Sequence, residues 1–433
     1  MQIGAPLFRG VGGAAPGGGT GTGGGDATGG GSATPTPLDV TADIAADTTW
    51  TSDHIYTLKQ LTYVQAGATL TIQPGTTVLG DPGSALIVSR DARLVADGTA
   101  QAPIVFSSSL PVGERGLTAA DGWGGVLLLG RAPINTVGGE ENAEGVADES
   151  RNRYGGTDAA YDCGVIRYVR IEFAGIPVSA ANELNGLTIN GCGTGTLIDY
   201  VQVHRGIDDG IEIFGGTVNV KHLVLSGNDD DALDWDRGWT GKAQFIAIQQ
   251  TQGYGNHAIE ASSNPNNSTL TPVAHPVIYN LTAVGRAPDS SNPGEGVSRG
   301  INLKEGTQGE FYNFIITNFY ERALYVVGDD ARAAWGTELF VKNSVFFANP
   351  TDAITDSGFG EDTKVLDAAL SNQTVDPGLA AAKSVTAPDF KPTATLTGSA
   401  TPPDDGFFDP TATFIGAIGS VDWTAGWTAY PEN

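Results

Sequence analysis

The chain has 433 residues, of which 61 are glycine, and its formal net charge is −26 with a pI of about 4.3. A surface this acidic repels phosphate groups, which excludes nucleic acid as a partner and disfavours anionic membranes, whereas it attracts cations. The same charge keeps an extracellular protein in solution, and that is its simplest interpretation. With 40% apolar and only 17% charged residues, the composition suits many short strands joined by turns.

The first part of the chain lacks the composition of a folded domain. Residues 11–37 are almost all Gly, Ala, Thr, Ser and Pro, which cannot bury an apolar core. We therefore predict a flexible tether over residues 1–44. Residues 1–10 contain no apolar segment of the kind found in signal peptides, and no run of about 18 apolar residues predicts a transmembrane helix in the chain.

From about residue 49 the sequence changes to short apolar runs separated by turns. Leu70, Ile72 and Val78 alternate with polar residues around a turn at residues 73–76. The runs that follow are equally short, rich in β-branched residues, and bounded by Gly or Pro. No segment with helical periodicity separates them, so the pattern favours stacked short strands over alternating strands and helices.

The middle of the chain contains an internal repeat. A strand-like run, a polar turn and a second strand-like run occur in residues 197–213, 218–235 and 243–261, and weaker copies follow at 299–303 and 322–326. The copies are offset by 22 and then by 23 to 26 residues. This period is the length of one coil of a parallel β-helix, in which each coil buries its apolar face only against its neighbours.

The repeat predicts an all-β fold, a right-handed parallel β-helix (a solenoid) over residues 45–380. Residues 381–433 are rich in Pro and Trp, and we predict that they form a C-terminal capping segment packed on the β-helix. The insertions at 138–162, 174–184 and 262–298 are expected to emerge as loops on the side of the solenoid.

The two cysteines, Cys163 and Cys192, each precede a strand-like run. In a stacked solenoid they can lie on adjacent coils, so we predict a disulfide, with two buried free thiols as the alternative. A disulfide would fit an oxidising compartment.

The central motifs resemble a family of secreted bacterial β-helix proteins, widespread in Bacteroidetes and marine Proteobacteria and described as lipoproteins or cell-surface proteins. The resemblance covers residues 45–433. It rests on segments 124–135, 187–191, 199–203, 208–212, 214–222, 234–235, 238–239, 249–250 and 422–428. It implies a right-handed β-helix and export, hence an extracellular or outer-membrane-surface-attached location. The resemblance does not indicate which activity the protein has, and it identifies no catalytic residue. The lipid-carrying cysteine of such lipoproteins is missing here.

Stacking places equivalent residues of the repeat in columns. The first column contains Glu212, Asp234 and Glu260, followed by Asn302 and Tyr325, each between two apolar residues and therefore pointing outward. Three carboxylates about 5 Å apart repel one another, and they can share a cation. We predict ligand binding or Ca²⁺ binding at this column, with a solvated acidic surface as the alternative.

The second column contains Asp209, Asp231, His257, Arg299 and Arg322. Carboxylates, an imidazole and guanidinium groups on one edge are the groups that a glycoside hydrolase or a polysaccharide lyase requires, so they are the candidate catalytic residues. Opposite charges on neighbouring coils have a structural alternative as cross-strand ion pairs. A third column, with alternating charge, is expected to be structural and comprises Arg167, Asp199, Lys221 and Gln244.

Further candidates lie in the turns. Asp208 and Asp230 offer carboxylates for Ca²⁺, although Asp also favours tight turns for local hydrogen-bonding reasons. Trp235 is expected in the core, whereas Trp239 in the next turn is either a packed residue or an exposed platform for a sugar ring. The five histidines show no zinc-binding spacing.

These patterns favour a secreted or cell-surface protein that binds an extracellular polymer, a glycan, without catalysis. The alternatives are a polysaccharide lyase or glycoside hydrolase that acts along the side of the β-helix, and a structural adhesin or spacer. Ca²⁺ is the one ion that the acidic columns suggest, and the sequence does not predict an oligomeric state.

Overall fold

The computed structural model describes residues 34–179, 182–251, 253–286, 298–349 and 358–433. The chain divides into two units after Thr34, and the strands belong to the unit Pro35–Asn433. Most of the predicted tether, residues 1–33, therefore lies outside the described residues.

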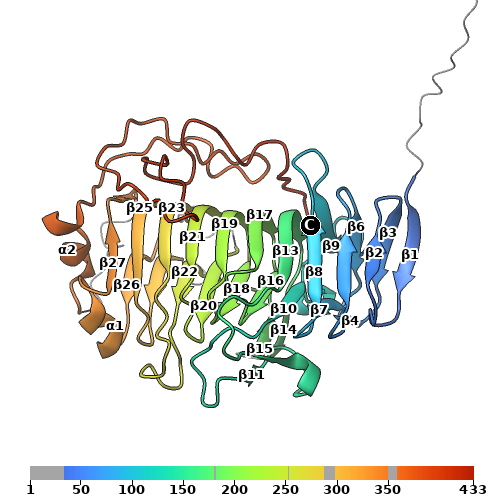
Figure 1. The fold of residues 1–433 in the computed structure, drawn as a ribbon. Helices are drawn as coiled ribbons and strands as arrows, with labels where there is room; N and C mark the ends of the chain where they lie inside the picture. Colours follow the sequence, from blue (N-terminus) through green and yellow to red (C-terminus); the bar gives the residue numbers. More distant parts are fainter. Residues whose placement is uncertain (1–33, 180–181, 252, 287–297, 350–357) are drawn as a thin grey trace, which may run out of the picture. The chain divides into compact units, whose positions relative to one another are not determined.

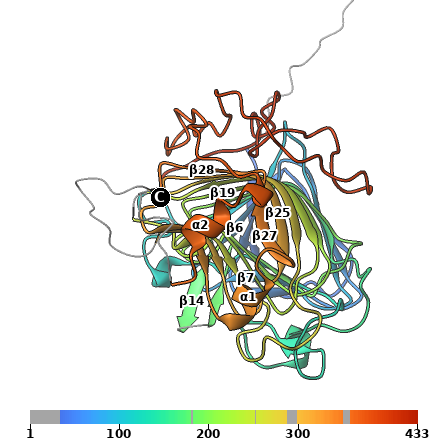
Figure 2. The same cartoon turned by 90° about the vertical axis from the view of Figure 1, so that its left-hand side faces the viewer.

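The strands stack in parallel into a β-helix, as predicted (Figures 1 and 2). One sheet, sheet B, has nine strands: β4 (Leu61–Val64), β7 (Ala85–Val88), β10 (Val126–Leu129), β16 (Leu187–Asn190), β18 (Ile211–Phe214), β20 (Leu233–Asp236), β22 (His257–Ala261), β24 (Arg299–Leu303) and β26 (Arg322–Val326).

The other sheet, sheet A, has fifteen strands: β1 (Thr36–Val40), β2 (Thr48–Trp50), β3 (His54–Leu58), β5 (Thr69–Ile72), β6 (Thr77–Gly80), β8 (Arg93–Asp97), β9 (Ile104–Ser108), β13 (Gly164–Glu172), β17 (Leu197–His204), β19 (Asn219–Ser226), β21 (Lys242–Gln249), β23 (Val277–Val284), β25 (Gly309–Thr317), β27 (Leu339–Lys342) and β28 (Val345–Phe347).

Strand β1 corrects the predicted start of the folded region. Thr36–Val40 pairs in parallel with β3, so the β-helix begins nine residues before position 45. Only Val40 of this strand is buried, and the strand is held by its backbone hydrogen bonds. Without alternating apolar residues, the sequence carried no signal for it.

The long strands of sheet A bend at one residue per coil. Each bend has a left-handed backbone, with φ between 48° and 62°, at Tyr168, Tyr200, His222, Phe245, Asn280 and Asn313. The bend explains why the separate strands β8 and β9 both pair with the single strand β13. Sheet A thus covers two faces of each coil and sheet B the third.

A left-handed backbone is unfavourable for aromatic residues, and stacking of their side chains offsets this cost. The rings of Tyr168 and Tyr200 stack with centroids 4.3 Å apart, and Tyr200 stacks on His222 at 4.1 Å. Phe245, at the next bend, stacks on His222 at 4.9 Å. The two bends after it carry Asn280 and Asn313, and Asn tolerates this conformation better than most residues.

One continuous apolar core fills the interior. In sheet B the inward residues Ile211, Leu233, Ile259, Ile301 and Leu324 pair in register on successive strands, and all are fully buried. Each such side chain contributes roughly 1.5 to 3 kcal/mol of burial free energy, so every added coil stabilises its neighbours.

The insertions predicted at 138–162 and 174–184 emerge from one side of the coils, opposite the C-terminal segment (Figures 1 and 2). The prediction of a single loop over 262–298 was wrong in part, because this range contains β23 of sheet A, and its residues 287–297 lie outside the described residues. Residues 138–162 carry the short antiparallel pair β11 (Glu141–Asn142) and β12 (Arg153–Tyr154), and a hairpin of β14 (Ile176–Ser179) and β15 (Asn182–Leu184) follows. The helical turns are brief: η1 (Ala119–Asp121), η2 (Ser150–Asn152), α1 (Asp329–Ala334), α2 (Glu361–Val365) and η3 (Ala368–Leu370).

The C-terminal segment packs on the β-helix, but along its side instead of over its end. We call residues 375–433 the strap; it runs back across sheet A from β27 towards β13 (Figure 1). Gln202 exchanges two hydrogen bonds with Ala429, and Asn313 exchanges two with Ala400. The composition indicates a non-repeating segment, but it does not predict which surface of the β-helix this segment packs against.

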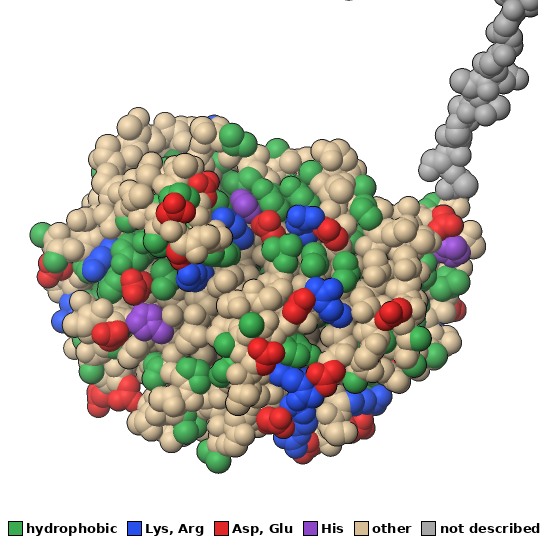
Figure 3. Space-filling view, in the orientation of Figure 1, with side chains coloured by type: hydrophobic (Ala, Val, Ile, Leu, Met, Phe, Trp, Pro, Cys, Tyr) green, Lys and Arg blue, Asp and Glu red, His purple; other side chains and the backbone are tan. Residues whose placement is uncertain are grey.

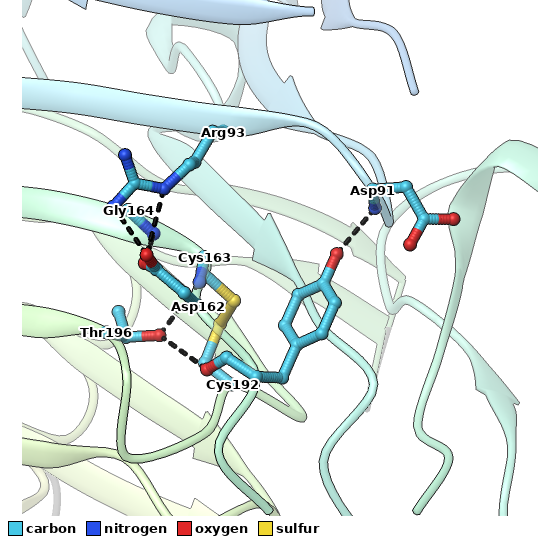
Figure 4. Close-up of a disulfide and its surroundings, with 8 residues drawn as sticks. Asp91, Arg93, Asp162, Cys163, Gly164, Cys192 and Thr196 are labelled. Carbon is cyan, nitrogen blue, oxygen red and sulfur yellow. Dashed lines mark hydrogen bonds and ion pairs between the residues drawn. A yellow bond between two sulfur atoms is a disulfide. The ribbon is translucent and has the colours of Figure 1, made fainter. Parts of the chain in front are cut away.

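The predicted disulfide between Cys163 and Cys192 is confirmed (Figure 4). The two Cα atoms are 5.9 Å apart, and both side chains are buried. The Cys163 amide donates to Thr196 Oγ1 at 2.9 Å, and that hydroxyl donates to the Tyr161 carbonyl at 3.3 Å. The bond therefore joins the start of β13 to the turn after β16, on the next coil.

Replacing both cysteines by alanine is expected to lower the free energy of unfolding by about 3 to 4 kcal/mol. The disulfide closes a loop between residues 29 positions apart, and without it the unfolded chain gains conformational entropy. Urea unfolding of the oxidised protein and the double variant measures the difference. Reduced wild-type protein is the control and should match the variant; an unchanged midpoint in both would contradict this role.

Asn313→Ala is expected to destabilise the protein by about 2 to 4 kcal/mol, because it leaves the half-buried backbone N–H and C=O of Ala400 unpaired and places Ala in a left-handed conformation. Amide hydrogen exchange over residues 398–416 should accelerate. Asn343→Ala is the matched control, since Asn343 shares that conformation but makes one exposed hydrogen bond, to Gly398. Equal effects of the two variants would show that the strap contact is unimportant.

Candidate functional site

The first acidic column lies on the outer face of sheet B, in the predicted register. Glu212 pairs with Asp234, Asp234 with Glu260, and Asn302 and Tyr325 continue the column. The carboxylates are not a solvated surface, however. Only 9% of Glu212 is exposed, and the other two carboxylates are half-buried.

The burial arises because two insertions close over the strands and form a cleft of about 350 Å³. The loop after β11 contributes Glu144, and the β14–β15 hairpin contributes Glu183, whose amide donates to Glu144 Oε1 at 3.3 Å. We call this the acidic cleft. Eleven carboxylates line it: Glu144, Glu183, Asp208, Asp209, Glu212, Asp230, Asp231, Asp234, Asp236, Glu260 and Glu305.

Two cationic side chains line the acidic cleft, and both are already paired. Arg237 contacts Asp236 and, outside the lining, Glu141. Lys304 Nζ lies 2.5 Å from Glu260 Oε2. Within the described ranges, no other carboxylate of the cleft forms an ion pair with Lys or Arg. On the face shown in Figure 3, by contrast, positive and negative side chains lie beside one another.

Burial and mutual repulsion shift the protonation of the cleft. Burial, together with the charge of Asp230, raises the pKa of Asp208 to about 8. Burial and the neighbouring Glu183 raise the pKa of Glu144 to about 7. The same two causes, burial first and nearby carboxylates second, hold four further pKa values well above their usual range, those of Asp209, Glu212, Asp231 and Asp234.

Of the second column, Asp209 and Asp231 line the cleft, but His257, Arg299 and Arg322 do not. His257 Nδ1 lies 2.8 Å from Asp231 Oδ1, and its Nε2 lies 3.3 Å from Arg299 Nη1. Both ring nitrogens are thus engaged, and burial lowers the pKa of His257 to about 4. An imidazole held in this way is poorly placed to move a proton in the cleft.

The two arginines of this column have structural partners. Arg299 pairs with Glu321 at 2.7 Å, and the guanidinium groups of Arg299 and Arg322 lie over the Tyr325 ring at 4.8 and 4.4 Å. These contacts match the alternative interpretation of the column as cross-strand charge pairing. The column remains in register, since Arg299 pairs with Arg322 across the sheet.

Trp239 corrects the prediction of a sugar-binding platform. Its side chain is fully buried, packs against Trp235 with ring centroids 5.5 Å apart, and donates from Nε1 to the Val218 carbonyl at 2.9 Å. The turn that carries it folds inward between coils, so the indole is part of the core.

The third column is structural, and it also anchors the strap. Arg167 pairs with Asp97, and Asp199 accepts from His222 at 2.7 Å. Lys221 donates to the Phe407 carbonyl, and Gln244 accepts from the Asp409 amide, both at 2.8 Å.

Among the described residues, three groups of side chains are close enough to hold a metal ion, with ligand atoms within 4.8 Å of one another: Asp208, Asp209 and Asp230; Asp209, Glu212 and Asp234; and Asp231, His257 and Glu260. The first two offer only carboxylate oxygens, which suit Ca²⁺. The predicted candidates Asp208 and Asp230 thus fall in one group, and the remaining members come from the first and second columns. Glu183 was missed, because a single glutamate in an insertion carries no repeat signal.

The geometry can be compared with known proteins. Residues 42–428 match the model of a family described as a pectate-lyase-like beta helix domain. No curated protein and no solved structure matches the chain. Among the helices of the described residues, none has the length and apolarity needed to cross a membrane.

Without divalent cations, the free energy of unfolding is expected to fall as the pH rises from about 6.5 to 8. Carboxyl groups of the unfolded chain are ionised throughout this window, whereas folded Asp208 and Glu144 still bind protons, so a rise in pH favours unfolding. The buried His204 and His257, with pKa values lowered to about 4 by burial, act below this window.

Urea unfolding in EDTA at several pH values within this window measures how steeply the free energy of unfolding depends on pH. Asp208→Asn should flatten this dependence, while Asn at the exposed Asp404 should leave it unchanged. A wild-type stability that rises with pH would contradict the assignment.

Proposed function

The chain belongs to the family of pectate-lyase-like β-helix domains, and from this premise we propose that it is an extracellular protein that holds an acidic polysaccharide in the acidic cleft through bound divalent cations, without cleaving it. The observation that carries the proposal is the concentration of eleven carboxylates against two paired cations in one cleft.

Divalent cations would offset the repulsion between the carboxylates of the acidic cleft. Carboxylates held together in a buried site must bind protons or cations, because their mutual repulsion is weakly screened there. Asp208, which is only 7% exposed, has a buried oxygen, Oδ2, without a hydrogen-bond donor in the described part of the chain. A buried oxygen of this kind fits a ligand of a hard cation.

The bound cations would also select the polymer. Ca²⁺ takes six to eight oxygen ligands, and each all-carboxylate group offers three side chains. Positions on the ion therefore stay open for carboxylate and hydroxyl oxygens of a sugar chain. A cleft this acidic repels an acidic polymer unless cations lie between the two, so binding should depend on them.

The state of the amine and guanidinium groups supports binding over a lyase reaction. A lyase needs a group that removes a proton from the sugar. Burial opposes charge on Lys304, but the ion pair with Glu260 outweighs it and raises the lysine pKa above its usual value. Arg237 is held between Glu141 and Asp236. Both Lys304 and Arg237 therefore stay protonated and cannot remove a proton from the sugar.

A glycoside hydrolase is the second candidate, because one observation favours it. The pKa of Glu144, raised to about 7 by burial and by the neighbouring Glu183, keeps this carboxyl partly protonated at neutral pH. A protonated acid next to a carboxylate is the pair that hydrolysis of a glycosidic bond requires.

Family membership and the buried disulfide both support an extracellular location, the latter because disulfides persist in oxidising compartments. The location outside the cell, free or attached to the outer membrane surface, is part of the proposal.

The full chain should bind an acidic polysaccharide such as polygalacturonate or alginate in CaCl₂, lose that binding in EDTA, and ignore a neutral glucan. Calorimetry or affinity electrophoresis measures this. The double variant Asp208→Asn, Asp234→Asn is expected to weaken binding at least about tenfold, a loss of roughly 1.4 kcal/mol, because it removes cation ligands. Asp404→Asn is the matched control on the strap.

Assays for new reducing ends on the same polymers decide between the two candidates. Their absence, together with Ca²⁺-dependent binding, supports the binding function. Their release, abolished by Glu144→Gln in a folded variant, would make the protein a hydrolase, and binding that persists in EDTA would overturn the role of cations.

A further inference from the structure

The two all-carboxylate groups of the acidic cleft share one residue, Asp209. The first group, Asp208, Asp209 and Asp230, lies in the turns that precede β18 and β20; the second, Asp209, Glu212 and Asp234, extends onto the strands themselves. Asp209 stands where the turn enters β18, between the two groups.

We propose that the cleft holds two divalent cations at once, bridged by the Asp209 carboxylate. The inference rests on the proposed function for the presence of cations in the cleft, and it adds their number and arrangement. Bridged ions of this kind lie about 3.5 to 4 Å apart. That separation is compatible with groups on successive coils, whose strands lie about 4.8 Å apart.

Each group contains one buried carboxylate oxygen that lacks a hydrogen-bond partner. In the part of the chain that the structure describes, only two carboxylate oxygens are in this state, Asp208 Oδ2 and Asp234 Oδ1. One belongs to the first group and the other to the second. A single cation would leave one of these buried oxygens unsatisfied, whereas two cations satisfy both.

The bridging residue is held in place. Asp209 is buried, and its Oδ1 accepts the Asp231 amide at 2.8 Å. Gly210 follows directly, and a side chain there would collide with the Asn228 side chain at 2.3 Å and the Ala232 carbonyl at 2.6 Å. The turn is thus packed tightly against the next coil, which fixes the carboxylate between the two groups.

The charges are consistent with two ions. Asp208, Asp209, Glu212, Asp230 and Asp234 form no ion pair with a Lys or Arg among the described residues, so the five supply up to five negative charges. Two divalent cations add four positive charges. The third group, Asp231, His257 and Glu260, differs because Glu260 is already paired with Lys304 and His257 with Arg299.

The open positions on two adjacent ions would form a receptor for paired oxygens of one ligand. Neighbouring carboxylate and hydroxyl oxygens of a sugar can bind both ions together, and this geometry favours a polymer over a single carboxylate.

Calcium titration of the full chain, followed by calorimetry and by native mass spectrometry, counts the ions. The titration is made well above pH 8, where Asp208 is mostly ionised. Wild-type protein should bind two Ca²⁺. Asp208→Asn and Asp234→Asn should each bind one, and Asp209→Asn should lower the affinity at both positions at least about tenfold, since the shared ligand is lost.

Asp404→Asn is the control and should bind two ions. Because native mass spectrometry counts ions on folded molecules only, a variant that folds in part still reports its number. One ion on the wild type, or two on both Asp208→Asn and Asp234→Asn, would overturn the bridged pair. If the wild type binds one ion and still takes up polysaccharide with Ca²⁺, the proposed function stands without the pair. Two ions with no polysaccharide bound would instead support the pair and overturn the proposed function.

Discussion

Parallel stacking in register is the constraint on which the rest of this structure depends. Every side chain has equivalents about 4.8 Å above and below it, so the residues of one coil must match those of the next. Inside, this aligns Ile211, Leu233 and Ile259 into one core. Outside, it aligns Glu212, Asp234 and Glu260, and here the register that builds the core forces like charges together.

What the sequence predicted follows from that constraint. The repeat sets which residues share a column, so the register, the core position of Trp235 and the contact between Cys163 and Cys192 were all accessible from it. Features without repetition were not. The burial of the acidic column comes from the insertions that carry Glu144 and Glu183, and their folding over sheet B leaves no periodic signal.

The same reasoning explains the errors. Trp239 lies in a turn, and a turn's sequence does not reveal whether its side chain points into the core or into solvent. The second column was correct as a set of neighbours, but neighbours on one edge need not line the same cleft. Asp209 and Asp231 line it, whereas His257 and Arg299 do not and hydrogen-bond to each other. Chemistry on this fold is decided by the irregular segments that cover a regular surface.

The strap gives this solenoid a property that repeat proteins generally lack. Stacks of coils can usually gain or lose a unit, because each coil contacts only its neighbours. Here the side chains of Gln202, Gln244, Asn280 and Asn313, on four different coils, hydrogen-bond to residues of one C-terminal segment, at Ala429, Asp409, Phe414 and Ala400. Adding or deleting a coil between them would displace these partners by a full strand spacing. The strap therefore links the number of coils to its own length. An insertion or deletion of one coil is expected to require a matching change in the length of the strap.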